Sequence, residues 1–249
     1  MKKVAIHQPH YLPWLGYMAK MVEADCFVFL DTVQYEKNGW QNRNKIKTRE
    51  GSQWLTVPVR APFPSRLLDV SIDHGQGWAR KHLQALRVHY ARAPYLGRYL
   101  PDLERILSHP WQGLPQLNVE LCRYLAGELG ISCRFELASR LSAREEPTDR
   151  LLDLCLAVGG ECYLAGQDGT KYMALERFET AGVRVWRQDY QHPVYAQVAG
   201  EFLPNLSVID LLLNHGEASG TIIENGNRWV PVDSSPVSPG SRTPNLARP

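Results

Sequence analysis

Apolar positions along this chain fall into short continuous runs and into helical repeats, and the two patterns alternate. Residues 2–8 and 26–30 form runs of strand length, and continuous runs of this kind suit parallel strands that are buried on both faces. Between them, the apolar residues of 12–24 recur near helical spacing. The start of the chain therefore predicts a strand, a helix and a second strand.

The alternation continues as far as residue 214. Further strands are predicted at 53–60, 67–72, 133–138, 161–165 and 183–188. Further helices are predicted at 78–92, 96–107, 114–129, 150–158, 171–180 and 203–214. Strands that alternate with helices favour an α/β fold, here a mostly parallel, Rossmann-like sheet with helices on both faces.

Two insertions interrupt this alternation. The strands at 53–60 and 67–72 flank a proline-rich turn, so we expect them to pair as an inserted β-hairpin. A helical insertion is predicted at about 76–130. Residues 34–51 lack periodicity and are predicted to form a long loop.

Composition is that of an ordinary soluble domain. Of the 249 residues, 44% are hydrophobic and 22% are charged, and the net charge of +2 argues neither for nor against a nucleic-acid ligand. Proline, serine, arginine and glycine dominate after about residue 227, so we expect a single domain at 1–226 and a flexible tail at 227–249.

No apolar run approaches the length of a membrane span. The five cysteines form no C-x-x-C pair, which favours reduced thiols in a cytoplasmic protein and argues against a zinc site.

The first predicted strand ends in the loop His7-Gln8-Pro9-His10, which leads into the first helix. Loops at the carboxyl ends of strands in open α/β sheets bind ligands, and imidazoles beside a helix N-terminus can stabilise phosphate charge. His7 and His10 are therefore candidate catalytic residues; the alternative is an exposed His10 and a His7 that binds only backbone. The neighbouring candidates for substrate binding are Gln8, Tyr11, Trp14 and Tyr17.

A basic segment at 34–47 carries four cations, one opposing glutamate and interleaved aromatic side chains. Arginine gives bidentate contacts to phosphate and tryptophan offers a stacking face, so the segment suits a nucleotide or a phosphorylated sugar. It also suits RNA, and the remaining alternative is a solvated loop without a ligand. The candidate substrate-binding residues here are Gln34, Lys37, Trp40, Asn42, Arg43, Asn44, Lys45 and Lys47.

Three further positions at strand ends carry candidate chemistry. Asp31, a candidate catalytic residue, closes the second strand, where a carboxylate could bind a ribose hydroxyl, an amine or a metal-held phosphate, or else only cap a turn. His192 follows a late strand and is a candidate general acid or base, with a structural role as the alternative. The loop at 166–169 is bracketed by glycines and could bind an anion or form a tight turn. The substrate-binding candidates of the last two positions are Gly166, Gln167, Gly169, Tyr172, Gln188, Tyr190 and Tyr195.

Some classes of enzyme are disfavoured. The sequence contains neither G-x-S-x-G nor H-E-x-x-H, which argues against the corresponding hydrolases and zinc enzymes. No residue is assigned to a metal.

A specific pattern of residues spans the chain up to about residue 216. Its main blocks are His7-Gln8-Pro9-x-Tyr11-Leu12-Pro13-Trp14-Leu15-Gly16-Tyr17, Val33-Gln34-Tyr35, Asn42-Arg43-Asn44, Trp54-Leu55-Thr56-Val57-Pro58-Val59, Ala93-Pro94-Tyr95, Tyr190-x-His192-Pro193-x-Tyr195-x-Gln197 and Leu206-Ser207-Val208-Ile209-Asp210-Leu211. These blocks closely resemble the WbqC-like family of bacterial proteins. The chain departs from many relatives at His10, where asparagine is expected, and at Ala165-Gly166, where serine and glycine are expected.

The resemblance implies a function. WbqC-like proteins are linked to gene clusters for O-antigen and other surface polysaccharides, and members are labelled glycine or aminoacyl transferases that act on amino sugars. We therefore expect a transferase or ligase that joins an amino acid or small acyl group to an amine, such as a nucleotide-linked amino sugar. Activation of a free acid would use ATP with Mg²⁺, whereas aminoacyl-tRNA or acyl-CoA would be donors that are already activated.

Two alternatives stay open at this point. One is a non-catalytic protein that binds sugar nucleotides or nucleic acid, and the other is a nucleotidyltransferase. In each case the expected small-molecule ligand is phosphorylated or nucleotide-linked, and the assembly considered is a homodimer.

Overall fold

A six-stranded sheet runs through the molecule in the order β10-β9-β8-β1-β2-β7. The computed structural model describes residues 1–232, apart from the side chain of Tyr172, so the predicted tail lies outside the described residues from 233 onward. Five strands pair in parallel, and β10 pairs antiparallel with β9 at one edge. The strands of this sheet are β1 (Lys3–His7), β2 (Cys26–Phe29), β7 (Arg134–Leu137), β8 (Cys162–Ala165), β9 (Arg184–Tyr190) and β10 (Asn227–Val232).

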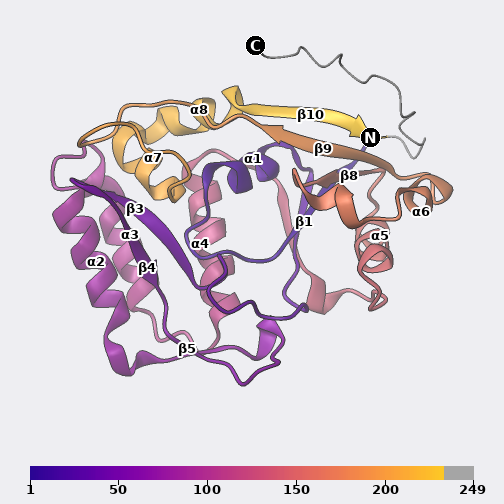
Figure 1. The fold of residues 1–249 in the computed structure, drawn as a ribbon, viewed down its shortest axis with the longest axis horizontal. Helices are drawn as coiled ribbons and strands as arrows, with labels where there is room; N and C mark the ends of the chain where they lie inside the picture. The colour runs from indigo at the N-terminus through magenta and orange to yellow at the C-terminus, as the bar shows by residue number, and fades with distance from the viewer. Residues whose placement is uncertain (233–249) are drawn as a thin grey trace, which may run out of the picture.

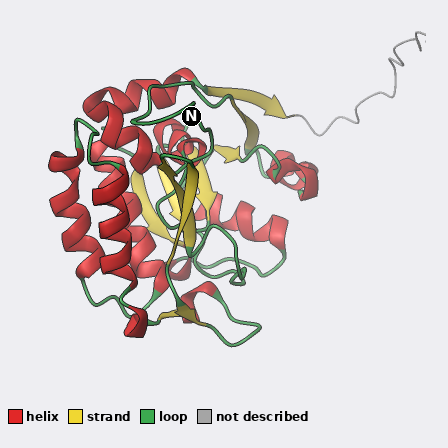
Figure 2. Ribbon diagram, turned by 60° about the vertical axis from the view of Figure 1, so that its left-hand side comes forward, coloured by secondary structure: helices red, strands yellow, loops and turns green. Residues whose placement is uncertain are grey.

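The central strands are buried on both faces, which explains their continuous apolar runs. In β1, Val4 and Ile6 pack into one apolar cluster and Ala5 packs into the other. Helices α5 (Pro147–Ala157) and α6 (Leu175–Thr180) cover the face of Val4 and Ile6. Helices lie on both sides of the strands (Figure 1, Figure 2), so the expected α/β sheet covered on both faces is confirmed. The helices of the opposite cluster are α1 (Leu15–Glu23), α2 (Trp78–His89), α3 (Leu96–Ser108), α4 (Leu114–Glu128), α7 (Val208–His215) and α8 (Ser219–Asn225).

Two small antiparallel pairs of strands stand beside the main sheet. β3 (Arg43–Thr48) pairs with β4 (Gly51–Thr56), and β5 (Val59–Arg60) pairs with β6 (Ser71–Ile72). The prediction of a long loop at 34–51 is therefore wrong for its second half. β3 buries asparagine and lysine side chains next to a single isoleucine, so its sequence shows no alternation of apolar and polar residues. The 3₁₀ turns are η1 (Leu67–Asp69), η2 (His74–Gln76), η3 (Ala138–Arg140), η4 (Gly169–Tyr172) and η5 (Gly216–Ala218).

The described chain ends in an edge strand where a tail was predicted. Residues 227–232 form β10, whereas the tail was predicted to begin at 227. The strand is only partly buried and contains Pro231, so it lacks the apolar pattern of the central strands. A proline is compatible with an edge strand because its missing N–H need not pair.

The order of the parallel strands identifies the edge where a ligand is expected. From β1 the chain moves outward to β2 and β7, and then returns to β8 on the other side of β1 and continues to β9. In open α/β sheets, ligands bind in the crevice at the carboxyl ends of two neighbouring strands whose connections diverge in this way. Here these ends are His7 of β1 and Ala165 of β8, so the fold itself indicates the surroundings of His7.

Candidate functional site

Two histidines and a tyrosine gather at the carboxyl end of β1. The ring centroids of His7 and His10 lie 4.6 Å apart, and the Tyr17 ring lies 4.9 Å from His7 and 5.0 Å from His10. His10 and Tyr17 are buried, and His7 is half-buried. The Tyr17 hydroxyl donates a hydrogen bond to the Gln8 carbonyl at 3.0 Å, which ties α1 to the loop. Four of the predicted site residues therefore lie together.

The cation of this cluster is Lys20, which was not among the predicted site residues. Lys20 lies on α1 one turn after Tyr17, and only 4% of its surface is exposed. Its ammonium has no hydrogen-bond acceptor and no carboxylate partner within the described residues. A Cβ placed on Gly166, which directly follows β8, would lie 3.3 Å from Lys20 Nζ. The ammonium therefore lies at the crevice between the ends of β1 and β8.

Burial and the lysine set the protonation states of the cluster. Burial, then the charge of Lys20 and the neighbouring His10, lower the pKa of His7 well below its usual value. Burial and Lys20 lower the pKa of His10 to about 3. Burial lowers the pKa of Lys20 itself to about 7. At neutral pH both imidazoles are therefore neutral, whereas the lysine is present in part as ammonium and in part as free amine.

Two imidazole nitrogens are suited to binding or reaction. His7 Nδ1 lies 3.2 Å from the Gln8 carbonyl, and because a carbonyl can only accept, Nδ1 carries the proton and Nε2 has a free lone pair. His10 Nδ1 is buried and has no hydrogen-bond partner in the described part of the chain. Buried polar groups are nearly always satisfied, so an unpaired imidazole beside an unpaired ammonium indicates a ligand that supplies the missing contacts.

Amide side chains from other elements hold the histidine loop. Asn44 of β3 donates to the Leu12 carbonyl at 2.6 Å, and Leu12 has a positive φ of 44°, which strains a leucine. Asn118 of α4 donates to the Pro9 carbonyl at 2.9 Å and to the Gln41 carbonyl at 2.7 Å. Asn44, predicted to bind substrate, therefore has a positioning role in this structure.

We expect Asn44→Ala to lower the free energy of unfolding by about 1–3 kcal/mol, because it leaves the buried Leu12 carbonyl without its donor. Urea denaturation measures the loss. Gln34→Ala, at an exposed position, is the matched control. Equal stability of the two variants would mean that the Asn44 side chain does not hold the loop.

Part of the predicted basic segment forms an exposed surface. Trp40 and Trp54 are 42% and 40% exposed, and their ring centroids lie 5.6 Å apart. The Arg43 guanidinium lies 4.3 Å and the Lys45 ammonium 4.8 Å from the centroid of the Trp54 ring. We call these four residues the hairpin surface. It adjoins the loop after β1, because the Tyr11 amide donates to the Trp40 carbonyl at 3.1 Å.

The other predicted residues of the basic segment lie apart from this surface. Gln34 and Lys37 are exposed. The Asn42 side chain is buried and donates to a backbone carbonyl between β4 and β5 at 3.0 Å. Lys47 is buried, and its ammonium donates to the Glu201 carbonyl. The structure therefore does not bring these residues to the histidine cluster.

A buried carboxylate organises the segment after β9. Asp210 of α7 is fully buried and accepts hydrogen bonds from the hydroxyls of Tyr90 and Tyr195, both at 2.8 Å, and from Gln197 Nε2 at 2.9 Å. Burial raises the pKa of Asp210, and the three donors oppose this rise. The Lys47 amide donates to the Tyr90 hydroxyl at 2.9 Å, so the network reaches β3. Tyr195, predicted to bind substrate, belongs to this Asp210 network.

His192 and Asp31 have their polar atoms bonded within the protein. His192 Nδ1 lies 2.9 Å from the Pro193 carbonyl, and Nε2 accepts from the Asn205 amide at 3.2 Å, so neither ring nitrogen is free. The Asp31 carboxylate accepts from the Ser139 amide at 2.9 Å and from its hydroxyl at 2.7 Å. Within residues 1–232, no hydrogen bond, ion pair or ring contact joins the side chain of either residue to the histidine cluster.

The remaining predicted residues contact α2 or lie beside α1. The Tyr11 hydroxyl lies 2.8 Å from a ring nitrogen of His82. Trp14 packs edge to face on Tyr190, with ring centroids 5.7 Å apart. Gln188 Nε2 donates to a carbonyl of α1 at 3.0 Å.

In the loop after β8, the Gly169 amide donates to the Gly166 carbonyl at 3.0 Å, which closes a tight turn. Gln167 in this turn is exposed. The side chain of Tyr172 lies outside the described residues.

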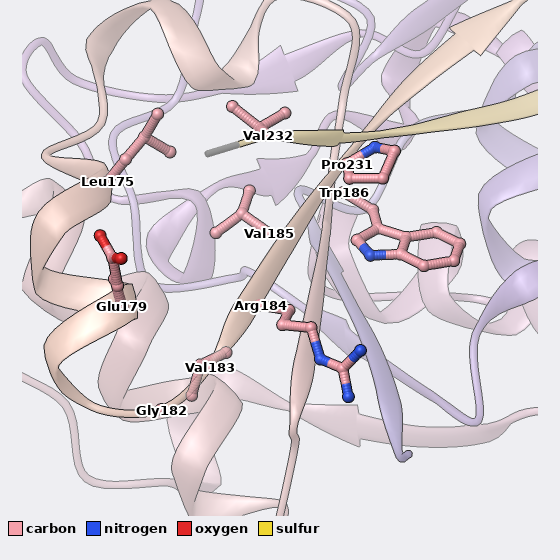
Figure 3. Close-up of a pocket in the computed structure, with 9 residues that line it drawn as sticks. All are labelled: Leu175, Glu179, Gly182, Val183, Arg184, Val185, Trp186, Pro231 and Val232. Carbon is pink, nitrogen blue, oxygen red and sulfur yellow. The ribbon is translucent and has the colours of Figure 1, made fainter. Parts of the chain in front are cut away.

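The pocket in Figure 3 lies at the other end of the strands from the histidine cluster. It has a volume of about 260 Å³ and lies at the amino end of β9, between α6 and β10. Leu175 and Val185 lie on one side of β9, whereas Arg184 and Trp186 extend to the other (Figure 3). Ligands of open α/β sheets bind at the carboxyl ends of the strands, so this place does not favour it as the functional site.

Within residues 1–232, no group of three or more His, Cys, Asp or Glu side chains is placed to hold a metal ion. In the same part of the chain, every helix is too short or too polar to cross a membrane. All five cysteines are free thiols.

Comparison with known proteins places this chain within a family. The sequence profile of the WbqC-like protein family matches residues 8–222, which include Lys20 and Gly166. An uncharacterized protein of Mycobacterium tuberculosis, Rv1507c, is 36% identical over 220 residues, which cover 87% of this chain and 95% of that protein. No solved structure matches the chain. The chain belongs to the WbqC-like protein family.

Proposed function

We propose that this protein is a transferase that forms an amide between a small acyl group, such as an amino acid, and an amine, such as a nucleotide-linked amino sugar. The observation that supports the proposal most is Lys20, a buried ammonium without a partner in the described chain, next to two neutral imidazoles at the ligand-binding edge of the sheet. Such an ammonium is suited to a phosphate or carboxylate of the acyl donor. The surface-polysaccharide role that the family resemblance implies supports an amino sugar as acceptor.

The chemistry assigns one task to each residue. The amine attacks the acyl carbon, a C–N bond forms, and the bond from that carbon to the leaving group breaks. His7 Nε2 takes the proton that the amine loses, which requires the neutral imidazole that its lowered pKa provides. Lys20 stabilises negative charge on the leaving group. ATP with Mg²⁺, which would activate a free acid, and the donors acyl-CoA and aminoacyl-tRNA all present phosphates, so the Lys20 ammonium is compatible with each of the three.

The hairpin surface favours a second candidate function, the binding of single-stranded nucleic acid. Two exposed tryptophans flanked by arginine and lysine are suited to stacking bases and to contacting phosphates. If aminoacyl-tRNA is the acyl donor, both candidate functions belong to one protein, because this surface adjoins the histidine loop.

We expect His7→Gln to lower the rate of amide formation by about 10²–10⁴-fold while donor binding is kept, because glutamine fills the position without accepting a proton. Mass spectrometry of UDP- or dTDP-linked amino sugars, incubated with ATP and glycine, glycyl-tRNA or acyl-CoA, detects the product. Thermal unfolding identifies which donor binds, since a ligand of the native state raises the midpoint.

Variants separate the candidate functions. Arg43→Ala should lose a midpoint shift that tRNA causes and keep one that acyl-CoA causes. A wild-type protein that binds a donor but forms no amide with any acceptor would contradict the transferase proposal, and tRNA binding alone would leave the nucleic-acid candidate standing.

A further inference from the structure

A second cavity lies at the carboxyl ends of the parallel strands, beside β2, which is the neighbour of β1. It has a volume of about 430 Å³ and lies between α4 and the ends of β2 and β7. Asp31, which follows β2, lines it together with Ser139 and Arg140, which follow β7. Since β2 pairs with β1, the cavity and the histidine cluster share the same edge. We call it the α4 cavity.

A single helix separates the α4 cavity from the histidine loop. Val119, Glu120 and Arg123 line the cavity from α4. Arg123 follows Val119 by four residues and Glu120 by three, so the three side chains lie on one side of the helix. The neighbouring Cys122 points to the loop instead, with its Sγ 3.6 Å from the His10 carbonyl. Ligands in the two places would therefore lie on adjacent faces of α4.

The charged groups of the cavity are available to a ligand. The side chains of Arg123, Arg140 and Glu120 have no hydrogen bond or ion pair with any described residue. The Asp31 carboxylate is held by Ser139 and does not pair with either arginine. A guanidinium offers a planar fork of donors that matches phosphate and carboxylate, and a free carboxylate accepts hydrogen bonds from hydroxyl or amino groups.

A tryptophan supplies a fixed apolar wall. Trp111 lines the cavity and is half-buried. Its Nε1 donates to the Ile106 carbonyl at 2.8 Å, and its ring packs edge to face on His109, with ring centroids 4.4 Å apart. The ring is therefore oriented before any ligand binds, and such a flat apolar surface can pack against the C–H groups of a sugar ring.

We propose that the α4 cavity binds a sugar that carries an anionic group. Arg123 and Arg140 bind the anion, Glu120 accepts hydrogen bonds from the hydroxyl or amino groups, and Trp111 packs against the ring. The binding site stands on the cavity alone. The further step, that this sugar is the acceptor of the acyl group, rests on the proposed function.

Isothermal titration calorimetry with glucosamine 1-phosphate tests the site. We expect the wild type to bind it, and the double variant Arg123→Gln/Arg140→Gln to bind at least about tenfold more weakly, since hydrogen bonds to charged groups are lost. Glucosamine without phosphate should bind as weakly as the sugar phosphate binds to the double variant.

Two further ligands identify which groups are recognised. Glucuronate tells whether a carboxylate can replace the phosphate, and inorganic phosphate tells whether the sugar ring contributes. Arg184→Gln, at the pocket in Figure 3, is the matched control and should bind like the wild type.

Two results would overturn the inference: no binding of these sugars to the wild type, or equal affinity in the double variant and the Arg184→Gln control. If circular dichroism shows that the double variant is unfolded, Arg140→Gln alone decides, because Arg140 is exposed. Arginine-dependent sugar binding without amide formation in any donor mixture would refute the transferase and leave the α4 cavity standing as a sugar site.

Discussion

Replacing Lys20 with methionine is expected to make the free protein more stable and to abolish its binding of an anionic donor. Lys20 is buried and has no partner within residues 1–232. A buried charge without a partner costs folding free energy, and methionine fills a similar volume without charge. We expect Lys20→Met to raise the free energy of unfolding at pH 7 by about 1–4 kcal/mol, the gain found for some buried ion pairs when apolar side chains replace them.

The difference in stability between the wild type and Lys20→Met should depend on pH. An unfolded chain titrates its lysine near the ordinary value of 10.5, whereas burial lowers the pKa of Lys20 in the folded protein to about 7. Between these two values the unfolded state binds more protons than the folded state, so stability rises with pH. The wild type should therefore gain stability from about pH 7 upward, and its difference from Lys20→Met should shrink over the same range.

Urea unfolding at several pH values measures this difference. Lys37→Met, at an exposed position, is the control, and its effect should stay within about 0.5 kcal/mol. A Lys20→Met variant that is less stable than the wild type at pH 7 would contradict an unpaired buried ammonium. Retention of a donor-induced rise in the unfolding midpoint would contradict its role in binding the donor.

The main sheet could be predicted because its central strands are buried on both faces and therefore have continuous apolar sequences. β3 could not be predicted, because the polar Asn44 and Lys47 are buried against carbonyl groups of distant segments, Leu12 and Glu201. A hydrophobic pattern reports burial of apolar groups and carries no sign of such hydrogen bonds. β10 was not predicted for a different reason, since a partly exposed edge strand needs little apolar sequence.

The place of the candidate site could be predicted from the strand, loop and helix around His7, but its cation could not. A lysine in an amphipathic helix normally faces solvent, whereas every residue from Leu15 to Met21 is buried. The available signal was that Lys20 is the one charged residue in this stretch. Conversely, Asn44 and Tyr195 carry groups that suit a ligand but bond to the protein itself, and the sequence does not say which partner lies nearby.

Replacing Asp210 with alanine is expected to lower the free energy of unfolding by about 3–5 kcal/mol, the largest loss of stability expected for one substitution here. The carboxylate accepts from Tyr90, Tyr195 and Gln197, and alanine would leave these three donors buried without it. Because Tyr90 also accepts from the amide of Lys47, the loss should spread to β3. Urea denaturation should show a lower midpoint.

Further variants separate the hydrogen bonds of Asp210 from its shape. Asp210→Asn keeps one acceptor oxygen and nearly the same volume, so we expect a smaller loss of about 1–3 kcal/mol. Asp102→Ala, which removes a surface pair with Arg105, is the control and should cost about 0–1 kcal/mol. If Asp210→Ala costs no more than this control, the three donors find water in place of the carboxylate. Contacts other than this network would then hold the segment between β9 and α7.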